Sequence, residues 1–185
     1  IDDAYDVAVD STRISSCQAH YGGGVALLGN AHDVSFYRSR IVTNSAKQAD
    51  GAGGGVAIVG GVYDVRFSGV SVEGNIKATA TPGDGVGVWI QDDGQGGHPD
   101  RILFDHQTKI HNHKNGRQGA GMFAVGAKNL ILDSVTFEDN HGIQGGGFFA
   151  RNCHIQRHHN VTFARNIAQD SGGGLWVDGS LDVNL

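Results

Sequence analysis

The stretch Asn129-Leu130-Ile131-Leu132-Asp133-Ser134-Val135-Thr136-Phe137-Glu138-Asp139-Asn140, followed by Gly145-Gly146-Gly147, decides the fold. It contains apolar residues at alternate positions, then an Asn, a short connection and a glycine run. The same order recurs along the chain, with Asn44 before the glycines of 53–55, Asn75 before 83–85 and Asn166 before 172–174. The sequence is therefore that of a repeat protein.

The period of the repeat is about 30 residues, measured from the last glycine of each run between Gly24 and Gly174. Periods of 20–50 residues are typical of solenoids and propellers. The apolar residues alternate with a period of two, which predicts short strands with one buried face, and no segment has the 3.6-residue period of a helix. The alternating pairs are Val25/Leu27, Val34/Phe36, Val56/Ile58, Val65/Phe67, Ile102/Phe104, Leu130/Leu132 and Val161/Phe163. A propeller blade of four strands needs about 40 residues, so a solenoid is favoured.

We therefore predict an all-β fold, a right-handed parallel β-helix of about six turns with three short strands in each repeat. The whole chain, residues 1–185, forms one such domain. Both ends fall in the middle of a repeat, so we expect the chain to be a fragment of a longer protein. One segment departs from the repeat: residues 91–100 carry extra Gly and Asp residues, and we expect them to form a loop that projects from the coil.

The recurring Asn predicts a structural ladder. Stacked turns place equivalent residues about 4.8 Å apart, so that side-chain amides can hydrogen-bond from one turn to the next. The predicted rungs are Asn44, Asn75, Asn140 and Asn166, and Cys17 and His113 occupy the equivalent position in two other repeats.

The order Phe137-x-x-Asn140 and Phe163-x-x-Asn166, each followed by a glycine run, resembles the repeats of chlamydial-type polymorphic outer-membrane proteins. The resemblance extends from about Asp6 to Val177. It implies a right-handed, pectin-lyase-like β-helical surface passenger that is adhesive and not enzymatic. Ile or Val replaces Phe in the early repeats, and we do not expect any part of this sequence to form the membrane-anchoring barrel of that family.

Composition excludes several classes of function. The chain has 30 Gly but only 2 Pro, as expected for many tight turns, and a net charge of −5 without a run of Lys or Arg. This argues against nucleic acid or an anionic membrane as the main partner. No apolar run approaches the ~20 residues of a membrane span.

The strand after each glycine run predicts a binding surface. Alternation places one residue of each pair outward, and these outward residues become aromatic along the chain: Trp89, Phe123, Phe149 and Trp176. An exposed apolar stripe is typical of a surface covered by a partner, and spaced aromatic rings also suit sugar binding. We expect the stripe to contact flanking segments of the same protein, a second copy of the chain or a glycan.

Two kinds of chemistry are alternatives. A polysaccharide lyase or hydrolase would use the carboxylates of Asp92, Asp93, Asp100 and Asp105, because hydrolysis needs two carboxylates about 5–10 Å apart across one groove. A divalent metal would use His106, His111 and His113, close in sequence to His98, because imidazole and carboxylate groups are zinc ligands. Otherwise no cofactor is expected.

The two cysteines, Cys17 and Cys153, lie about four and a half repeats apart, or ~20 Å along the coil. A disulfide needs Cα atoms within ~7 Å, so we predict that they are not bonded to each other. The favoured function is a non-catalytic structural or adhesive segment of a bacterial protein that is secreted or on the cell surface. The alternatives are a polysaccharide-active enzyme and a self-assembling fibre unit.

Overall fold

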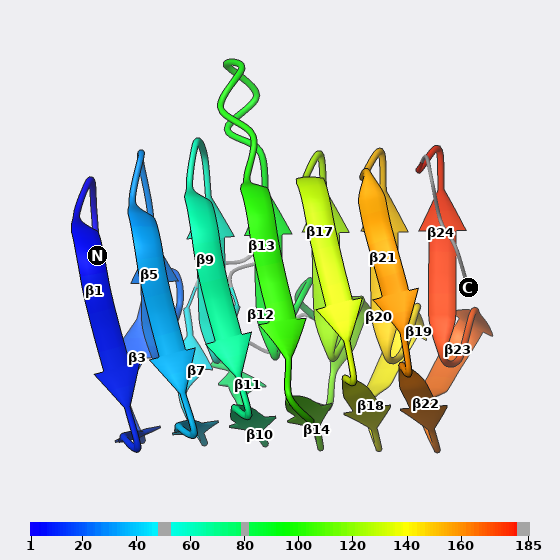
Figure 1. Cartoon of the computed structure of the whole chain (residues 1–185). Coiled ribbons are helices and arrows are strands. Elements are labelled where there is room, and N and C mark those ends of the chain that lie inside the picture. Colours follow the sequence, from blue (N-terminus) through cyan, green and yellow to red (C-terminus); the bar gives the residue numbers. More distant parts are fainter. Residues whose placement is uncertain (48–52, 79–81, 181–185) are drawn as a thin grey trace.

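The computed structural model describes residues 1–47, 53–78 and 82–180. Every regular element in these ranges is a β-strand, and the strands stack as a parallel solenoid of about six turns (Figure 1), as predicted. The same part of the chain holds no helix long and apolar enough to cross a membrane.

Three six-stranded parallel sheets form the walls of the coil. Face 1 consists of β1 (Tyr5–Asp10), β5 (His32–Tyr37), β9 (Tyr63–Ser68), β13 (Asp100–Asp105), β17 (Lys128–Asp133) and β21 (Ile155–His159). Face 2 consists of β2 (Arg13–Ser15), β6 (Arg40–Val42), β10 (Ser71–Glu73), β14 (Lys109–His111), β18 (Thr136–Glu138) and β22 (Thr162–Ala164). Face 3 consists of β4 (Val25–Leu27), β8 (Val56–Val59), β12 (Val88–Gln91), β16 (Met122–Val125), β20 (Phe148–Arg151) and β24 (Leu175–Asp178).

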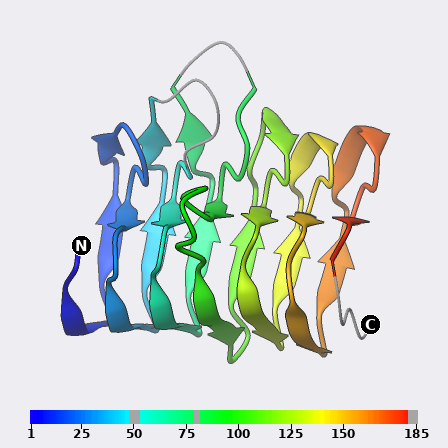
Figure 2. The same cartoon turned by 90° about the horizontal axis from the view of Figure 1, so that it is seen from above.

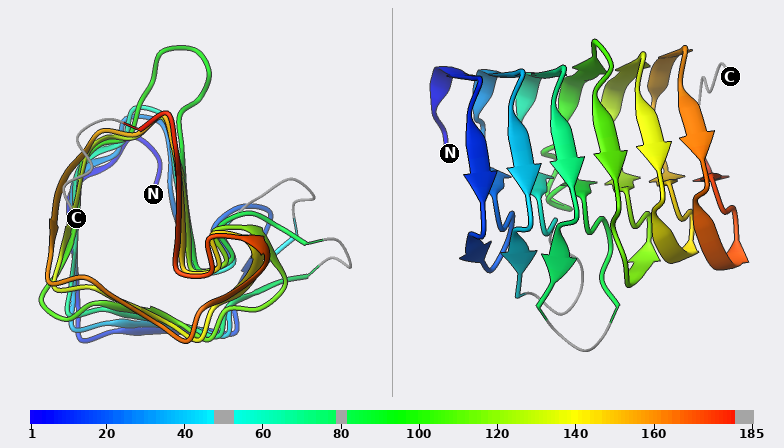
Figure 3. Two further views of the ribbon diagram at one scale, coloured as in Figure 1. Left: turned by 90° about the vertical axis from the view of Figure 1, so that its right-hand side faces the viewer. Right: turned by 90° about the horizontal axis from the view of Figure 1, so that it is seen from below.

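Each turn also has a fourth strand, which the prediction of three strands per repeat missed. These strands form two three-stranded sheets: β3 (Gln18–Ala19), β7 (Ser45–Ala46) and β11 (Ile76–Lys77), then β15 (Gly116–Gln118), β19 (His141–Gln144) and β23 (Ile167–Ser171). Seen along the axis, they make a side arm that bends away from the main coil beside face 3 (Figure 3). Figure 2 shows the same strands following one another along one side of the stack. The arm was missed because its strands are short and lack clear apolar alternation.

The register of the strands explains the repeat. Val34 pairs with Val65, which pairs with Ile102, so that equivalent apolar residues stack directly on one another. Alternate residues of each strand point into the coil, and the predicted inward pairs belong to its core, with Val161 and Phe163 of the last turn partly buried. Three phenylalanine rings stack along the axis inside face 1: Phe36, Phe67 and Phe104, with ring centroids 4.9 and 4.8 Å apart.

The glycine runs are required by backbone geometry and by close packing. Gly145 has φ +57°, and a Cβ atom there would lie 2.6 Å from the carbonyl oxygen of Phe148. Two residues later, a Cβ on Gly147 would lie 3.1 Å from the side chain of Asn166 in the next turn. Because the glycine run of one turn packs against the Asn of the next, the two features recur together in the sequence.

Candidate functional site

The predicted Asn ladder is present inside the coil. Asn44, Asn75 and Asn140 are fully buried, and Asn166 lies at the last rung. The backbone N–H of Asn44 donates to Asn75 Oδ1 at 2.8 Å, and that of Asn140 donates to Asn166 Oδ1 at 3.1 Å. Each Asn Nδ2 donates to a backbone carbonyl of the preceding turn. The ladder therefore satisfies buried backbone groups and has a structural role.

His113 is the rung that differs. Its imidazole is completely buried, and its Nε2 lies 3.1 Å from the carbonyl oxygen of Val72, which is the place that Asn Nδ2 takes in other rungs. The ring offers no oxygen to the backbone N–H of Asn75, and the described hydrogen bonds give that N–H no acceptor equivalent to the one at Asn44. Burial lowers the pKa of His113 to about 4, so the ring is neutral at pH 7.

The predicted aromatic stripe lies on the outer side of face 3. Val88 and Ile90 point into the coil, whereas Trp89 belongs to a separate apolar cluster outside it. Within this cluster, which we call the outer column, the rings of Phe149 and Phe123 lie 5.3 Å apart and those of Phe149 and Trp176 lie 4.2 Å apart. The expected inside-outside phase of these strands is therefore correct.

The expectation that the stripe is an exposed surface is wrong. Phe149 is 0 % exposed, Phe123 6 % and Trp89 7 %, and only Trp176 is partly exposed. The chain itself covers the rings: Tyr21 stacks on Trp89 with centroids 5.8 Å apart, and the Arg151 guanidinium lies 5.2 Å from the Phe149 centroid. The outer column is thus a second apolar cluster on the outer side of face 3, covered in part by Tyr21 and Arg151. It offers little free surface to a ligand.

The predicted insertion forms a loop of residues 92–99 between β12 and β13. It projects beyond the connections of all neighbouring turns (Figures 1 and 3). Asp93 braces it from within, because its Oδ1 accepts hydrogen bonds from the backbone N–H groups of Gln95 at 2.8 Å and Gly97 at 2.9 Å. These donors lower the pKa of Asp93. The base of the loop is held by His98, whose Nδ1 lies 3.1 Å from the carbonyl oxygen of Gly126.

A cleft of about 390 Å³ opens beside this loop at the start of face 1. We call it the loop cleft, and its lining comprises Asn30, Gly61, Tyr63, Gly96, Gly97, His98, Asp100, Arg101 and Lys128. These residues come from four turns of the solenoid. The volume lies within the 300–1,000 Å³ that is usual for ligand pockets.

Charges within the loop cleft are largely paired. Arg101 binds both carboxylate oxygens of Asp64, at 2.5 and 2.7 Å, and one oxygen of Asp100 at 2.8 Å. Asn129 donates to the other oxygen of Asp100 at 2.7 Å. The ring of Tyr63 is stacked on His32 on one side and has the Arg101 guanidinium 5.3 Å from its centroid. The cleft therefore presents polar edges rather than an open aromatic face.

The four carboxylates proposed for catalysis do not share one groove. Asp100 and Asp105 stand at opposite ends of β13, five residues or about 16 Å apart. Asp92 and Asp93 lie in the loop, where both accept hydrogen bonds from loop backbone N–H groups. Burial raises the pKa of Asp105, but hydrogen bonds from Arg66, Ser68 and His106 outweigh it and leave the pKa below its ordinary value.

The histidines proposed as metal ligands are separated by the fold. His113 lies inside the coil, His111 is on the outer side of face 2 and His106 is at the corner between faces 1 and 2. His98 belongs to the loop cleft. In residues 1–47, 53–78 and 82–180, no three His, Cys, Asp or Glu side chains are arranged to hold a metal ion. Cys17 is exposed and Cys153 is buried, and both are free thiols, as predicted.

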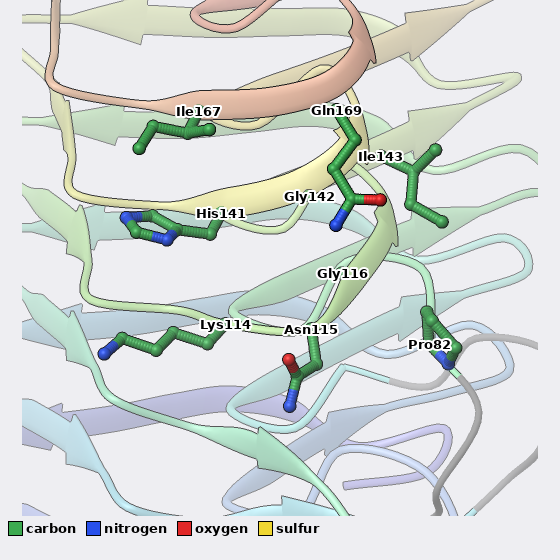
Figure 4. Close-up of a pocket in the computed structure, with 9 residues that line it drawn as sticks. All are labelled: Pro82, Lys114, Asn115, Gly116, His141, Gly142, Ile143, Ile167 and Gln169. Carbon is green, nitrogen blue, oxygen red and sulfur yellow. The ribbon is translucent and has the colours of Figure 1, made fainter.

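A second cavity, of about 270 Å³, lies on the second sheet of the arm, which is formed by β15, β19 and β23. Figure 4 shows that Ile167, His141 and Lys114 extend to one side and that Gln169 and Ile143 lie on the other, with the backbone of Gly142 and Gly116 between them. Pro82 and Asn115 complete the lining. We call this cavity the arm trough.

Comparisons with protein-family models, curated proteins and solved structures gave no match to this chain. The site must therefore be judged from its own residues. Sequence reasoning selected the loop but missed Tyr63, Arg101 and Lys128, which reach the loop cleft only through the register of face 1. One signal was present: Tyr5, His32 and Tyr63 each open a strand of face 1, and their rings stack in succession.

Proposed function

We propose that this protein is a non-catalytic recognition segment of a secreted or cell-surface protein, and that it binds a glycan through the loop cleft. The observation that carries the proposal is the braced loop of residues 92–99. It is the longest departure from an otherwise regular coil in the described residues, and it stands over a cleft lined by polar side chains. Loops on rigid scaffolds commonly carry binding functions.

The chemistry of the loop cleft suits a hydroxyl-rich, uncharged ligand. Arg101 is bound to two carboxylates, those of Asp64 and Asp100, and the Lys128 ammonium that also lines the cleft brings the sum of these four charges to zero. The same groups retain hydrogen-bonding capacity at their edges. The hydroxyl of Tyr63, the amide of Asn30 and the imidazole of His98 add donors and acceptors around the cavity. Sugar hydroxyl groups, which both donate and accept hydrogen bonds, complement such a set.

The pairing of the carboxylates supports a non-catalytic role. Asp93 and Asp105 have lowered pKa values and stable hydrogen-bond donors, so neither is prepared to act as a general acid near pH 7. The Phe-x-x-Asn and glycine-run order supports a relationship to polymorphic outer-membrane protein repeats, with a right-handed coil and a surface location.

The test uses a chimaera that removes only the loop. Residues 92–99 are replaced by Gly-Gly-Val, the connection that residues 60–62 make one turn earlier, so that β12 and β13 stay joined by a natural turn of this solenoid. The wild-type chain and the chimaera are incubated with a panel of neutral and acidic polysaccharides. Protein retention and polysaccharide chain length are both measured.

We expect the wild-type chain to be retained by a neutral glycan without shortening it, and the chimaera to fold but lose retention. The variant Asn30→Ala should weaken retention, whereas Lys109→Ala on the outer side of face 2 should not. Retention by the chimaera equal to that of the wild type would contradict the assignment of the site. Shortening of a polysaccharide would overturn the non-catalytic role.

A further inference from the structure

The arm trough differs in charge from other cavities of the described structure. None of its nine lining residues is acidic, although the protein has a net charge of −5. Four other cavities each contain at least one Asp: Asp100, Asp84, Asp10, and Asp105 with Asp133. A cavity without carboxylates in an acidic protein is the place where an anionic group meets the least repulsion.

The trough is also lined by a lysine, Lys114, that is available to bind an anion. Lys114 has no salt-bridge partner among the described residues, whereas the arginines Arg101, Arg117 and Arg165 are all bound to carboxylates. Asp139, which lies close to His141 along the chain, is held by two hydrogen bonds from Arg165 at 2.9 and 3.0 Å. In Figure 4 the Lys114 side chain extends to the same side as those of His141 and Ile167. Its flexible four-carbon stem lets the ammonium group meet an anion bound beside it.

The remaining lining combines apolar and amide groups. Ile143, Ile167 and Pro82 give the trough aliphatic walls, and Ile167 is 53 % exposed. Asn115 and Gln169 bring amides that can bind hydroxyl groups. A ligand with one carboxylate, several hydroxyls and an apolar ring face would complement all three parts of the surface.

We propose that the arm trough binds a uronate-type residue of an acidic saccharide, with Lys114 facing its carboxylate. A peptide is disfavoured as the ligand because extended peptides bind by adding a strand to a free sheet edge. The strand in the middle of the trough, β19, offers no such edge, because it is paired with β15 on one side and with β23 on the other. This site and its ligand are separate from the loop cleft and its neutral glycan.

The experiment follows the backbone amide resonances of Gly116 and Gly142 in a ¹⁵N-labelled chain by NMR. The probes are trigalacturonate, its fully methyl-esterified form, in which uncharged esters replace the carboxylates, and triglutamate. We expect trigalacturonate to shift both resonances with an affinity that falls as salt is added, and both other probes to bind at least fivefold more weakly.

The variant Lys114→Met should weaken trigalacturonate binding about fivefold, the loss expected for one exposed ion pair. The matched control Lys109→Met removes an exposed lysine from face 2 and should change nothing, and the loop chimaera should bind as the wild type does. Equal binding of the ester would overturn the role of charge, and equal binding of triglutamate would overturn the saccharide assignment. Absence of shifts at Gly116 and Gly142 would overturn the site, whatever the loop cleft binds.

Discussion

Two columns of stacked side chains run along the same solenoid, one inside the coil and one outside it. The inner column is the polar ladder from Asn44 to Asn166, and each of its rungs satisfies backbone groups of adjacent turns. The outer column, from Trp89 to Trp176, is apolar and is held by ring stacking and by coverage from Tyr21 and Arg151. The comparison teaches that outward-facing positions in a solenoid need not be exposed.

The largest effect on the free energy of unfolding is expected from a substitution in the outer column. Phe149→Ala removes a fully buried ring between Phe123 and Trp176 and should lower the free energy of unfolding by about 4 kcal/mol. Urea denaturation followed by circular dichroism measures the change. Val177→Ala, at a 38 % exposed position in β24, is the control and should cost far less. Equal costs would mean that the outer column is not a packed cluster.

A substitution in the inner column should lower the free energy of unfolding slightly less. Asn140→Ala leaves the N–H of His113 and the carbonyl of Ile110 buried without their partners, and we expect a loss of about 3 kcal/mol in the free energy of unfolding. This loss is measured by the same urea denaturation, followed by circular dichroism. The exposed Asn30→Ala should be nearly neutral by comparison. A neutral Asn140→Ala would contradict a structural role for the ladder.

A third prediction separates the His rung from the Asn rungs by pH. The folded state holds the pKa of His113 at about 4, below its ordinary value of 6.5, so protonation favours the unfolded chain. Stability from this residue is complete above pH 6.5 and falls as the pH drops from 6.5 toward 4, by about 2 kcal/mol at pH 5.

The measurement is the free energy of unfolding of the wild type and of His113→Asn at pH 7 and pH 5. Asn cannot be protonated here and restores the oxygen that the N–H of Asn75 lacks. The variant should therefore lose the part of the acid sensitivity that comes from this rung. An unchanged difference between pH 7 and pH 5 would show that other histidines, such as the half-buried His111, account for it.

The smallest effect is expected at the loop, outside both columns. Asp93→Ala removes the acceptor of the Gln95 and Gly97 amides but no core contact. Hydrogen exchange at these two amides should become faster, while the urea midpoint stays where it is. A shift of the midpoint would mean that the loop contributes to the stability of the coil.

Much of the fold could be predicted from the chain because each repeat obeys the same local rules. Alternation in pairs such as Val34 and Phe36 sets the inward face, and the Asn44-type ladder follows from stacking. The arm could not be predicted, since two-residue strands such as β7 leave no periodic signal. The coverage of Phe149 by Arg151 could not be predicted either, because alternation along a strand does not determine which side chains contact each other.

The candidate sites, too, could be predicted from the sequence only in part. The loop was recognisable as an interruption in the repeat, but the residues around it were not. Tyr63 and Lys128 are 65 positions apart in the chain and meet at the loop cleft only because three turns of face 1 stack in register.

The sequence by itself determined the repeat, the parallel coil, the inner ladder and the position of the loop, because all four depend on residues with a fixed spacing along the chain. Only the tertiary structure decided which outer residues are covered, which charges are paired and which side chains share a cavity. These properties depend on contacts between turns and between the arm and face 3, and such contacts follow from the path of the backbone in space.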